Sequence, residues 1–375
     1  MSEPSSPRIV IVGAGPAGIR AAATLVDAGL HPVVIDEGHR AGGQIYRRPP
    51  AGFVRTPEQL YGFAADKARA LHLLFDRMAE EGRLTYCARS SVIAVHEGRL
   101  HVLGEGGAEV VFYDRLILAT GASDRVAPVP GWQNAGVFSL GAAQIALKAQ
   151  GVALGQRIVL IGSGPLLTLV GMQLLKAGAD LAAVLDTSSW RQQMRGFWGL
   201  AARPIVALRG LALRARLGRR YHAGVTPLQI EANGRGVTGM RWRDAGGRER
   251  VTPCDMIGIG WHLRAETHLT DLAGCAFTYD EQWRQWLPKT DRMGRAGNGI
   301  YLAGDGARPV GADGEANRVK SLSRVGMGRC QGRYCQLAAA ELIAAHAGCR
   351  PEDVGRFRGQ APIRPAPIGA FLRES

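Results

Sequence analysis

Short apolar runs that end in glycine turns set the pattern along this chain. Residues 8–12 (RIVIV) are mostly β-branched, which predicts a buried strand of a parallel sheet. A glycine-rich turn over 13–18 and a helical pattern follow at once, and residues 32–35 (PVVI) predict a second strand. This strand–helix–strand order predicts a βαβ unit of an α/β fold.

The same order returns near the middle of the chain. Residues 157–161 (RIVLI) predict a strand, Gly162 and Gly164 lie in the turn after it, and a helical pattern then runs to Lys176. Residues 181–185 predict the next strand, which ends at Asp186. Two such units imply two dinucleotide-binding-type domains in one chain.

The first turn carries the chemistry of a dinucleotide site. Gly13, Gly15 and Gly18 stand at the G-x-G-x-x-G spacing, which suits a tight turn, close approach of a pyrophosphate and close helix–strand packing, respectively. The N-terminus of the helix offers N–H groups and a partial positive charge to phosphates. Asp36 ends the second strand, where a carboxylate can accept hydrogen bonds from an adenosine ribose.

The second turn departs from this pattern at its third glycine, where Leu167 stands. We expect a side chain there to push the helix away from the strand and to hinder the close approach of a nicotinamide dinucleotide. Two interpretations remain open for this unit: modified or lost NAD(P)H binding, which we favour slightly, or a structural relic.

Two further apolar strands end in polar or glycine turns. Residues 116–122 read LILATGA and residues 299–306 read GIYLAGDG. A carboxylate at Asp305 can accept hydrogen bonds from flavin ribityl hydroxyls, and the neighbouring glycines allow backbone contact with a pyrophosphate.

Length and composition favour a globular protein of two domains. The chain has 375 residues, of which 46% are apolar. It holds no run of about 18 uncharged apolar residues, so we expect no membrane span. Residues 1–7 resemble no signal peptide, and the expected location is the cytoplasm.

The net charge of +14 raises nucleic-acid binding as a hypothesis, which we discount. The basic residues are nearly all Arg and are scattered along the chain rather than aligned on one element. The segment richest in basic residues is 203–220, and two interpretations are open for it. We favour a crossover helix whose Arg side-chain stems cover apolar surface over a helix that faces a membrane or an acidic partner.

Four motifs in order, GAGPAG, LATGA, GSG and GIYLAGD, resemble the two-dinucleotide-domain flavoproteins related to glutathione reductase. The resemblance implies an FAD-binding domain over 1–140 and 292–315, discontinuous because its Gly-Asp segment returns late in the chain. A second nucleotide-binding-like domain would span 141–291. The implied FAD contacts are Gly13, Gly15, Pro16, Ala17, Gly18, Asp36, Glu37, Gly43, Gln44, Thr120, Gly121, Gly304 and Asp305; Gly162, Gly164 and Asp186 would form a second nucleotide site.

A narrower resemblance rests on residues 35–37, 42–47, 162–167, 326–335 and 362–369. These segments look like the larger subunits of heteromeric amine-oxidising dehydrogenases. That group includes the A-type subunits of opine oxidases, the alpha subunit of D-hydroxyproline or proline dehydrogenase, and the B-type subunit of hydrogen cyanide synthase; GSGPLL is typical of it. The resemblance implies that a D-amino-acid-oxidase-like partner takes hydride from the substrate, while this subunit relays the electrons.

The six cysteines favour neither a disulfide framework nor a redox dithiol. No C-x-x-C or C-x4-C lies directly after the first strand–helix unit, and no C-x-x-C lies in the second domain, so thiol–disulfide exchange is a poor hypothesis. Cys330 and Cys335 could bind one iron of a [2Fe–2S] cluster, which normally takes four cysteines. The resembling subunits supply the other two from a C-x-C that this chain lacks, so residues 316–375 are interpreted as a helical, ferredoxin-like remnant.

We therefore expect no complete [2Fe–2S] cluster within this chain alone. A cluster shared with another subunit, such as a small ferredoxin-like one, a different metal, or two inert thiols remain open, with inert thiols as the default.

Two other segments leave their roles open. Tyr46-Arg47-Arg48 follows the Gly-Gly-Gln turn, where Arg could contact a flavin or its pyrophosphate. Trp261-His262 ends an apolar strand of the second domain and could face a nucleotide, although an ordinary loop pair is the more frequent outcome.

The function that these patterns favour is electron transfer within a heteromeric FAD-dependent dehydrogenase of the opine, hydroxyproline or proline type. No nucleophile–base set is present, so we expect no catalytic side chain. The alternatives are a stand-alone NAD(P)H-dependent flavin or ferredoxin-type reductase and a degenerate, non-catalytic assembly subunit.

Overall fold

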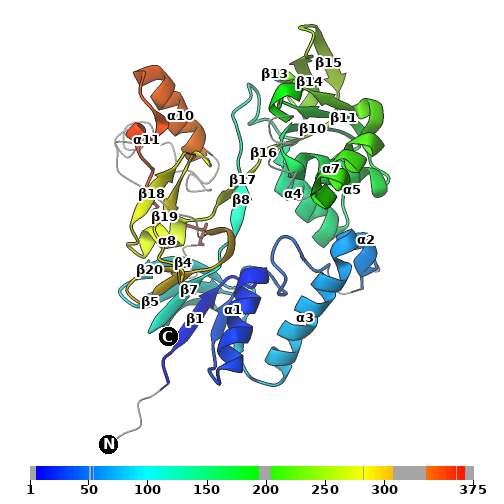
Figure 1. Cartoon of the computed structure of the whole chain (residues 1–375). Coiled ribbons are helices and arrows are strands. Elements are labelled where there is room, and N and C mark those ends of the chain that lie inside the picture. The colour runs from blue at the N-terminus through cyan, green and yellow to red at the C-terminus, as the bar shows by residue number, and fades with distance from the viewer. Residues whose placement is uncertain are drawn as a thin grey trace, which may run out of the picture. The chain divides into compact units, whose positions relative to one another are not determined.

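Two compact units make up the chain. The computed structural model describes residues 6–49, 52–53, 55–193, 204–281, 283–306, 335–359 and 361–367. The first unit combines Met1–Ser123 with Arg264–Ser375, and the second unit is Asp124–Leu263 (Figure 1).

A six-stranded sheet forms the middle layer of the first unit. From edge to edge its strands are β20 (Arg295–Gly297), β21 (Ile300–Leu302), β7 (Arg115–Leu118), β1 (Ile9–Val12), β2 (Val33–Ile35) and β3 (Thr85–Cys87). All neighbours are parallel except β20 and β21. The strands predicted in residues 8–12, 32–35, 116–122 and 299–306 thus lie side by side in one sheet.

Different layers cover the two faces of this sheet. Helices α1 (Pro16–Asp27) and α3 (Ala65–Glu80) pack on one face, where Ile11, Ile19 and Phe75 are buried together. The other face packs on an antiparallel layer of β4 (Ser91–His96), β5 (Arg99–Gly104) and β6 (Gly107–Phe112). The short α2 (Pro57–Tyr61) and the 3-10 turn η1 (Gly62–Ala64) precede α3. Because β1 is covered on both faces, all four of its residues are buried, which explains its unbroken apolar sequence.

The second unit repeats these three layers. Its sheet is wholly parallel, in the order β12 (Tyr221–Ala223), β11 (Asp180–Asp186), β10 (Arg157–Ser163), β16 (Met256–Trp261) and β9 (Val137–Ser139). One face packs on helices α4 (Leu140–Ile145), α5 (Pro165–Lys176) and α7 (Pro204–Leu217). The other face packs on the antiparallel strands β13 (Thr226–Asn233), β14 (Gly236–Arg243) and β15 (Glu249–Pro253).

The prediction of an α/β fold with two Rossmann-type units is confirmed. In each unit a strand, a glycine turn, a helix and a parallel strand are followed by a three-stranded antiparallel layer and a return to the sheet, at β7 or β16. The predicted crossover helix corresponds to α7, which connects the parallel strands β11 and β12. Arg220 just beyond it bonds to the carbonyl of Leu181 in its own unit.

Two short strands lie where the chain passes between the units. They are β8 (Ala122–Asp124) and β17 (Leu263–Ala265), which pair with each other. The boundaries expected at 140/141 and 291/292 stay a prediction, and the two compact units divide at 123/124 and 263/264. Strand β9 is an edge of the second sheet, whereas Leu269 and Cys275 are buried in the core of the first unit.

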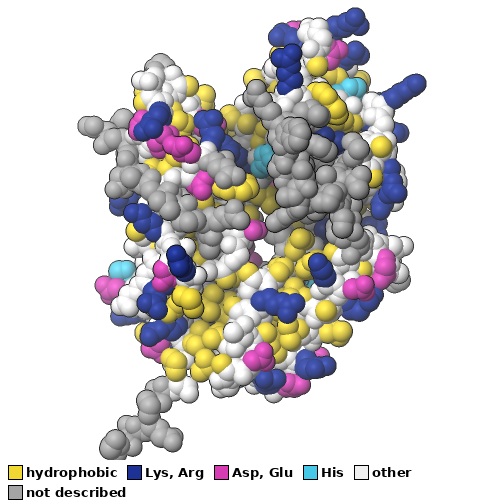
Figure 2. All heavy atoms as spheres, in the orientation of Figure 1, with side chains coloured by type: hydrophobic (Ala, Val, Ile, Leu, Met, Phe, Trp, Pro, Cys, Tyr) yellow, Lys and Arg dark blue, Asp and Glu magenta, His cyan; other side chains and the backbone are white. Residues whose placement is uncertain are grey.

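The remaining elements follow β17 in the first unit. They are α8 (His268–Leu272), the hairpin β18 (Phe277–Asp280) and β19 (Gln285–Pro288), the 3-10 turn η4 (Gly304–Gly306), α10 (Cys335–Ala347) and α11 (Pro351–Val354). In the part of the chain that the structure describes, no helix is long and apolar enough to span a bilayer. Figure 2 shows Lys and Arg dispersed over the face drawn, among acidic and apolar side chains.

Candidate functional site

The three glycines of the first turn serve different purposes. Gly13 has φ +105°, and a Cβ there would lie 2.3 Å from the carbonyl oxygen of Ala119. A Cβ on Gly18 would lie 1.8 Å from the carbonyl oxygen of Gly13. Gly15 has ordinary extended geometry, and its Cβ would meet only Gly43 Cα, at 3.7 Å. The fold therefore requires glycine at 13 and 18, whereas at 15 the missing side chain leaves room beside the turn.

This room lies at the start of α1. Gly15 is the N-cap of the helix and offers no side chain to the first amides, and the first turn, which begins with Pro16, contains no acidic residue. The amides of the first helical turn, including that of Ala17, have no carbonyl partner within the helix. They and the helix dipole suit an anionic phosphate group.

Asp36 joins the end of β2 to the glycine turn. Its Oδ2 accepts a hydrogen bond from the amide of Ala14 at 2.5 Å, and its Oδ1 accepts one from Gly38 at 2.6 Å. Burial raises the pKa of Asp36, and these two hydrogen bonds act in the opposite direction. Each oxygen of a carboxylate can accept more than one hydrogen bond, so Asp36 can also accept a ribose hydroxyl.

The Gly-Gly-Gln turn packs directly on the fingerprint turn. The amide of Gly42 donates to the carbonyl of Ala14 at 2.8 Å, and a Cβ on Gly43 would lie 2.7 Å from Gly15 Cα. Gln44, the next residue, is exposed. Two segments about thirty residues apart in sequence are thus held in contact by glycines on both sides.

Two more strand ends complete this group. After β7, the hydroxyl of Thr120 donates to the carbonyl of Glu266 at 2.7 Å, and the carbonyl of Gly121 accepts from the amide of Glu266. After β21, Gly304 approaches α1 so closely that a Cβ would lie 2.8 Å from the Cβ of Ala17. Asp305 follows it and is exposed. The predicted residues of the first site therefore gather at the carboxyl ends of β1, β2, β7 and β21, the usual ligand edge of such sheets; their contact with a coenzyme stays a prediction.

In the second unit, a histidine stands against the corresponding turn. Gly162 is required by the fold, because a Cβ there would lie 1.7 Å from the carbonyl oxygen of Gly260. Gly164 is the N-cap of α5 and lies against the imidazole of His262. A Cβ on Gly164 would lie only 2.7 Å from Nδ1 of that ring. His262 itself adopts a left-handed backbone with φ +66°. The ring therefore lies against the turn at which phosphates bind in an open site of this type.

Asp186, the expected ribose acceptor of the second unit, is used by the protein itself. Its side chain is 1% exposed and accepts hydrogen bonds from the Tyr221 hydroxyl at 2.6 Å and the Ser188 amide at 2.8 Å. Burial, together with the carboxylate, raises the pKa of Tyr221, so the hydroxyl stays protonated and donates. Because this carboxylate is almost fully buried, unlike that of Asp36, a ribose could reach Asp186 only if its neighbours moved away.

Leu167 is accommodated in the core rather than exposed in the turn. It is fully buried between α5 and the sheet, in an apolar cluster with Leu140 and Leu160. The second unit thus keeps the backbone of a nucleotide site, with His262 against its glycine turn and Asp186 hydrogen-bonded within the protein; nucleotide binding at Gly162, Gly164 and Asp186 stays a prediction.

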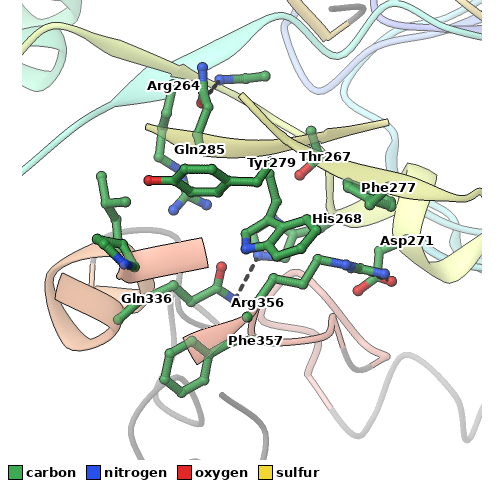
Figure 3. A pocket seen from close by; sticks show the side chains of 16 residues that line it. Arg264, Thr267, His268, Asp271, Phe277, Tyr279, Gln285, Gln336, Arg356 and Phe357 are labelled. Carbon is green, nitrogen blue, oxygen red and sulfur yellow. Dashed lines mark hydrogen bonds and ion pairs between the residues drawn. The ribbon is translucent and has the colours of Figure 1, made fainter. Parts of the chain in front are cut away.

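Sequence reasoning missed a pocket that the fold assembles in the first unit. It is lined by the β18–β19 hairpin, α8, α10 and residues 355–357, and Figure 3 shows Tyr279, Phe277 and Phe357 around it. His268 and Glu266 are buried, and Nδ1 of His268 lies 2.5 Å from Oε1 of Glu266. Nη1 of Arg356 forms an ion pair with Oδ1 of Asp271 at 2.6 Å. No spacing motif marks these residues, because they come from segments some seventy residues apart that only the fold brings together.

Of the two cysteines predicted as possible iron ligands, the structure describes only one. Cys330 lies outside the described residues, and Cys335 is the first residue of α10. Among the residues that the structure describes, no three His, Cys, Asp or Glu side chains are grouped as metal ligands. Cys254 and Cys275 are buried, and burial raises the pKa of their thiols to about 12 and about 11.

We predict that iodoacetamide at near-neutral pH alkylates the exposed Cys349 of the native chain far faster than Cys254 or Cys275. The reason is that only the thiolate reacts, and burial of Cys254 and Cys275 disfavours their thiolates. Peptide mass spectrometry after timed quenching measures this, and the urea-unfolded chain is the control in which all three react alike. Labelling of Cys275 as fast as Cys349 in the native chain would contradict the buried placement.

Comparison with known proteins agrees with this architecture. Residues 7–325 match the pyridine nucleotide-disulphide oxidoreductase family. The A-type subunit of opine oxidase from Rhizobium meliloti is 30% identical over 97% of this chain and 87% of that protein. Hydrogen cyanide synthase subunit HcnB of Pseudomonas aeruginosa is 32% identical over 84% of this chain and 70% of that protein.

Among solved structures, L-proline dehydrogenase from P. horikoshii has a similar fold, with a TM-score of 0.72 and 18% identity over 98% of this chain and 79% of that one. The alignment with the R. meliloti protein extends over 467 residues, more than the 375 of this chain. That relative therefore contains insertions that this chain lacks.

Proposed function

The chain belongs to the pyridine nucleotide-disulphide oxidoreductase family and is an FAD-dependent oxidoreductase, and from this premise we propose that it is the electron-transferring subunit of a heteromeric amine or amino-acid dehydrogenase. Its relatives carry the names of subunits of multi-subunit enzymes, opine oxidase and hydrogen cyanide synthase. An opine, hydroxyproline or proline is the proposed class of substrate.

The first unit fits FAD. The room beside Gly15 and the uncapped start of α1 suit its pyrophosphate, Asp36 suits its adenosine ribose, and Asp305 suits its ribityl hydroxyls. When bound, FAD supplies the redox chemistry, accepting and passing on electrons. The residues of this chain then bind and orient the coenzyme, and none of them acts as an acid, base or nucleophile in the proposal.

The occupied second unit is the observation that favours this role over a stand-alone reductase. An NAD(P)H-dependent reductase needs an open nicotinamide-dinucleotide site, but Asp186 is bound by Tyr221 and Ser188, and His262 stands at Gly164. Electrons would therefore reach the flavin from a partner rather than from NAD(P)H. We propose that this partner is a D-amino-acid-oxidase-like catalytic subunit.

The onward electron path is part of the same proposal. Cys330 and Cys335 supply at most two of the four ligands that a [2Fe–2S] cluster takes, so a cluster would need another chain, such as a small ferredoxin-like subunit. Two inert thiols remain the simpler alternative.

Anaerobic reduction of the complex purified through a tag on this chain tests the proposal. We expect the flavin absorbance to bleach with an opine, proline or hydroxyproline only when the co-purifying subunit is present, and to resist NADH and NADPH in the isolated chain. Bleaching of the isolated chain by NADH would instead establish the reductase alternative. A complex and an isolated chain that both lack flavin would establish an assembly subunit.

A further inference from the structure

The end of β2 carries two carboxylates, and arginines from distant segments approach them. Asp36 and Glu37 follow the strand directly. Arg47 comes from the segment after the Gly-Gly-Gln turn and is close enough to interact electrostatically with both carboxylates. Arg364 comes from the far end of the chain: its Nε donates to Glu37 Oε1 at 2.8 Å, and its Nη2 contacts the same oxygen.

The segment that carries Arg364, here called the tail strap (residues 355–359 and 361–364), is fixed to the first unit along its length. Phe357 and Ile363 are 5% and 2% exposed. Arg356 and the amide of Gly359 both bind the carboxylate of Asp271, as Figure 3 shows for Arg356, and the amide of Ile363 donates to the carbonyl of Ile93 on β4. The position of Arg364 is therefore set by the packing of the residues before it and by its own bonds to Glu37.

Both arginines keep a buried donor without a partner. Among the described residues, Nη1 of Arg364 and Nε of Arg47 are buried and make no hydrogen bond. A guanidinium stays charged at every physiological pH, so it cannot relieve this by losing a proton. An unpaired buried donor is costly, which indicates that an acceptor belongs there. Arg364 bonds to Glu37, and Arg47 interacts electrostatically with Asp36 and Glu37, at the strand end where the adenosine of a dinucleotide is expected.

We propose that Arg364 of the tail strap is a further coenzyme-binding residue, which donates through Nη1 to an oxygen or ring-nitrogen acceptor in the adenosine part of FAD. Glu37 is then a positioning residue, because it holds the other two nitrogens of the guanidinium. The C-terminal part of the chain thereby closes the coenzyme site that the N-terminal turn opens. This inference rests on FAD in the first unit but not on the amine substrate or on any partner subunit.

The inference predicts a selective loss of FAD affinity in the Arg364→Gln chain. We expect the dissociation constant for FAD, measured by equilibrium ultrafiltration of the full-length chain, to rise about tenfold, the usual effect of losing one charge-assisted hydrogen bond. Affinity for FMN, which has no adenosine part, should stay unchanged. Arg358→Gln removes the same charge from an exposed position of the same strap and serves as the matched control.

A second measurement does not depend on any variant. Binding and strap docking are linked, so FAD should slow tryptic cleavage of the wild-type chain after the exposed Arg358, whereas FMN should not. An Arg364→Gln chain that binds FAD as tightly as the wild type, or equal cleavage with and without bound FAD, would overturn the role of the strap alone. A wild-type chain that binds no FAD would overturn the coenzyme assignment itself, so the two failures are distinguishable.

Discussion

A Gly15→Val chain is expected to fold normally and to purify without flavin. The backbone at Gly15 is extended, and a Cβ there would make only an ordinary contact, 3.7 Å from Gly43 Cα. The protein itself therefore tolerates a side chain at this position. The branched methyl groups would instead fill the room beside the start of α1, so we expect FAD affinity to fall by more than about a hundredfold.

Two other glycine substitutions make this test specific. Gly18→Ala places a Cβ 1.8 Å from the Gly13 carbonyl oxygen and should lower the stability of the chain even without flavin. Gly106→Ala, where a Cβ meets nothing within 4 Å, should change neither stability nor flavin content. Absorbance of the purified proteins and thermal unfolding measure both properties. Full flavin content in a folded Gly15→Val chain would refute the placement of the pyrophosphate.

A large loss of stability is expected from Leu167→Gly, the substitution that restores the glycine pattern of the second turn. Leu167 is fully buried, so its removal leaves a cavity and a glycine inside a helix. We expect the free energy of unfolding to fall by about 3–5 kcal/mol, of which about 1 kcal/mol is the helix penalty of glycine. No NADH binding should be gained, because Asp186 remains bound by Tyr221 and Ser188.

The chain offers a matched control on the same helix. Leu169 also belongs to α5 but is 37% exposed, so Leu169→Gly carries the same helix penalty with far less loss of packing. We expect it to lower the free energy of unfolding by about 1–2 kcal/mol. Denaturant unfolding compares the two variants, and isothermal titration with NADH tests binding. Tight NADH binding by Leu167→Gly would mean that this leucine alone had closed the site.

The sequence predicted the elements that depend on local pattern. The four apolar runs of the first unit are strands of one sheet because residues buried on both faces of a sheet must be apolar without interruption. Each glycine fingerprint begins a helix, since proline at the first helical position and glycine before it favour a sharp turn. These signals lie within a few neighbouring residues and can be recognised without the rest of the chain.

Features that depend on distant residues were not predictable in the same way. The donor that occupies Asp186 is Tyr221, thirty-five positions later, and the ring that stands at Gly164 is that of His262. Glu37 stays a predicted coenzyme contact, and its bond to Arg364, more than three hundred positions later, was not predictable from the sequence. Only the folded chain brings such residues together. The pairing of β9 with β16 is of the same kind, because it depends on a strand more than a hundred residues away.

The first unit is built from both ends of the chain, which has a consequence for its synthesis. Strand β21 fills the place beside β7, and Ile363 is buried in the same core as Val10. A ribosome releases residues 124–263, the uninterrupted second unit, long before these late parts emerge. Residues 1–123 must therefore remain with an incomplete core while residues 124–263 fold. A premature stop near the C-terminus would then destabilise the first unit, although most of its sheet was synthesised first.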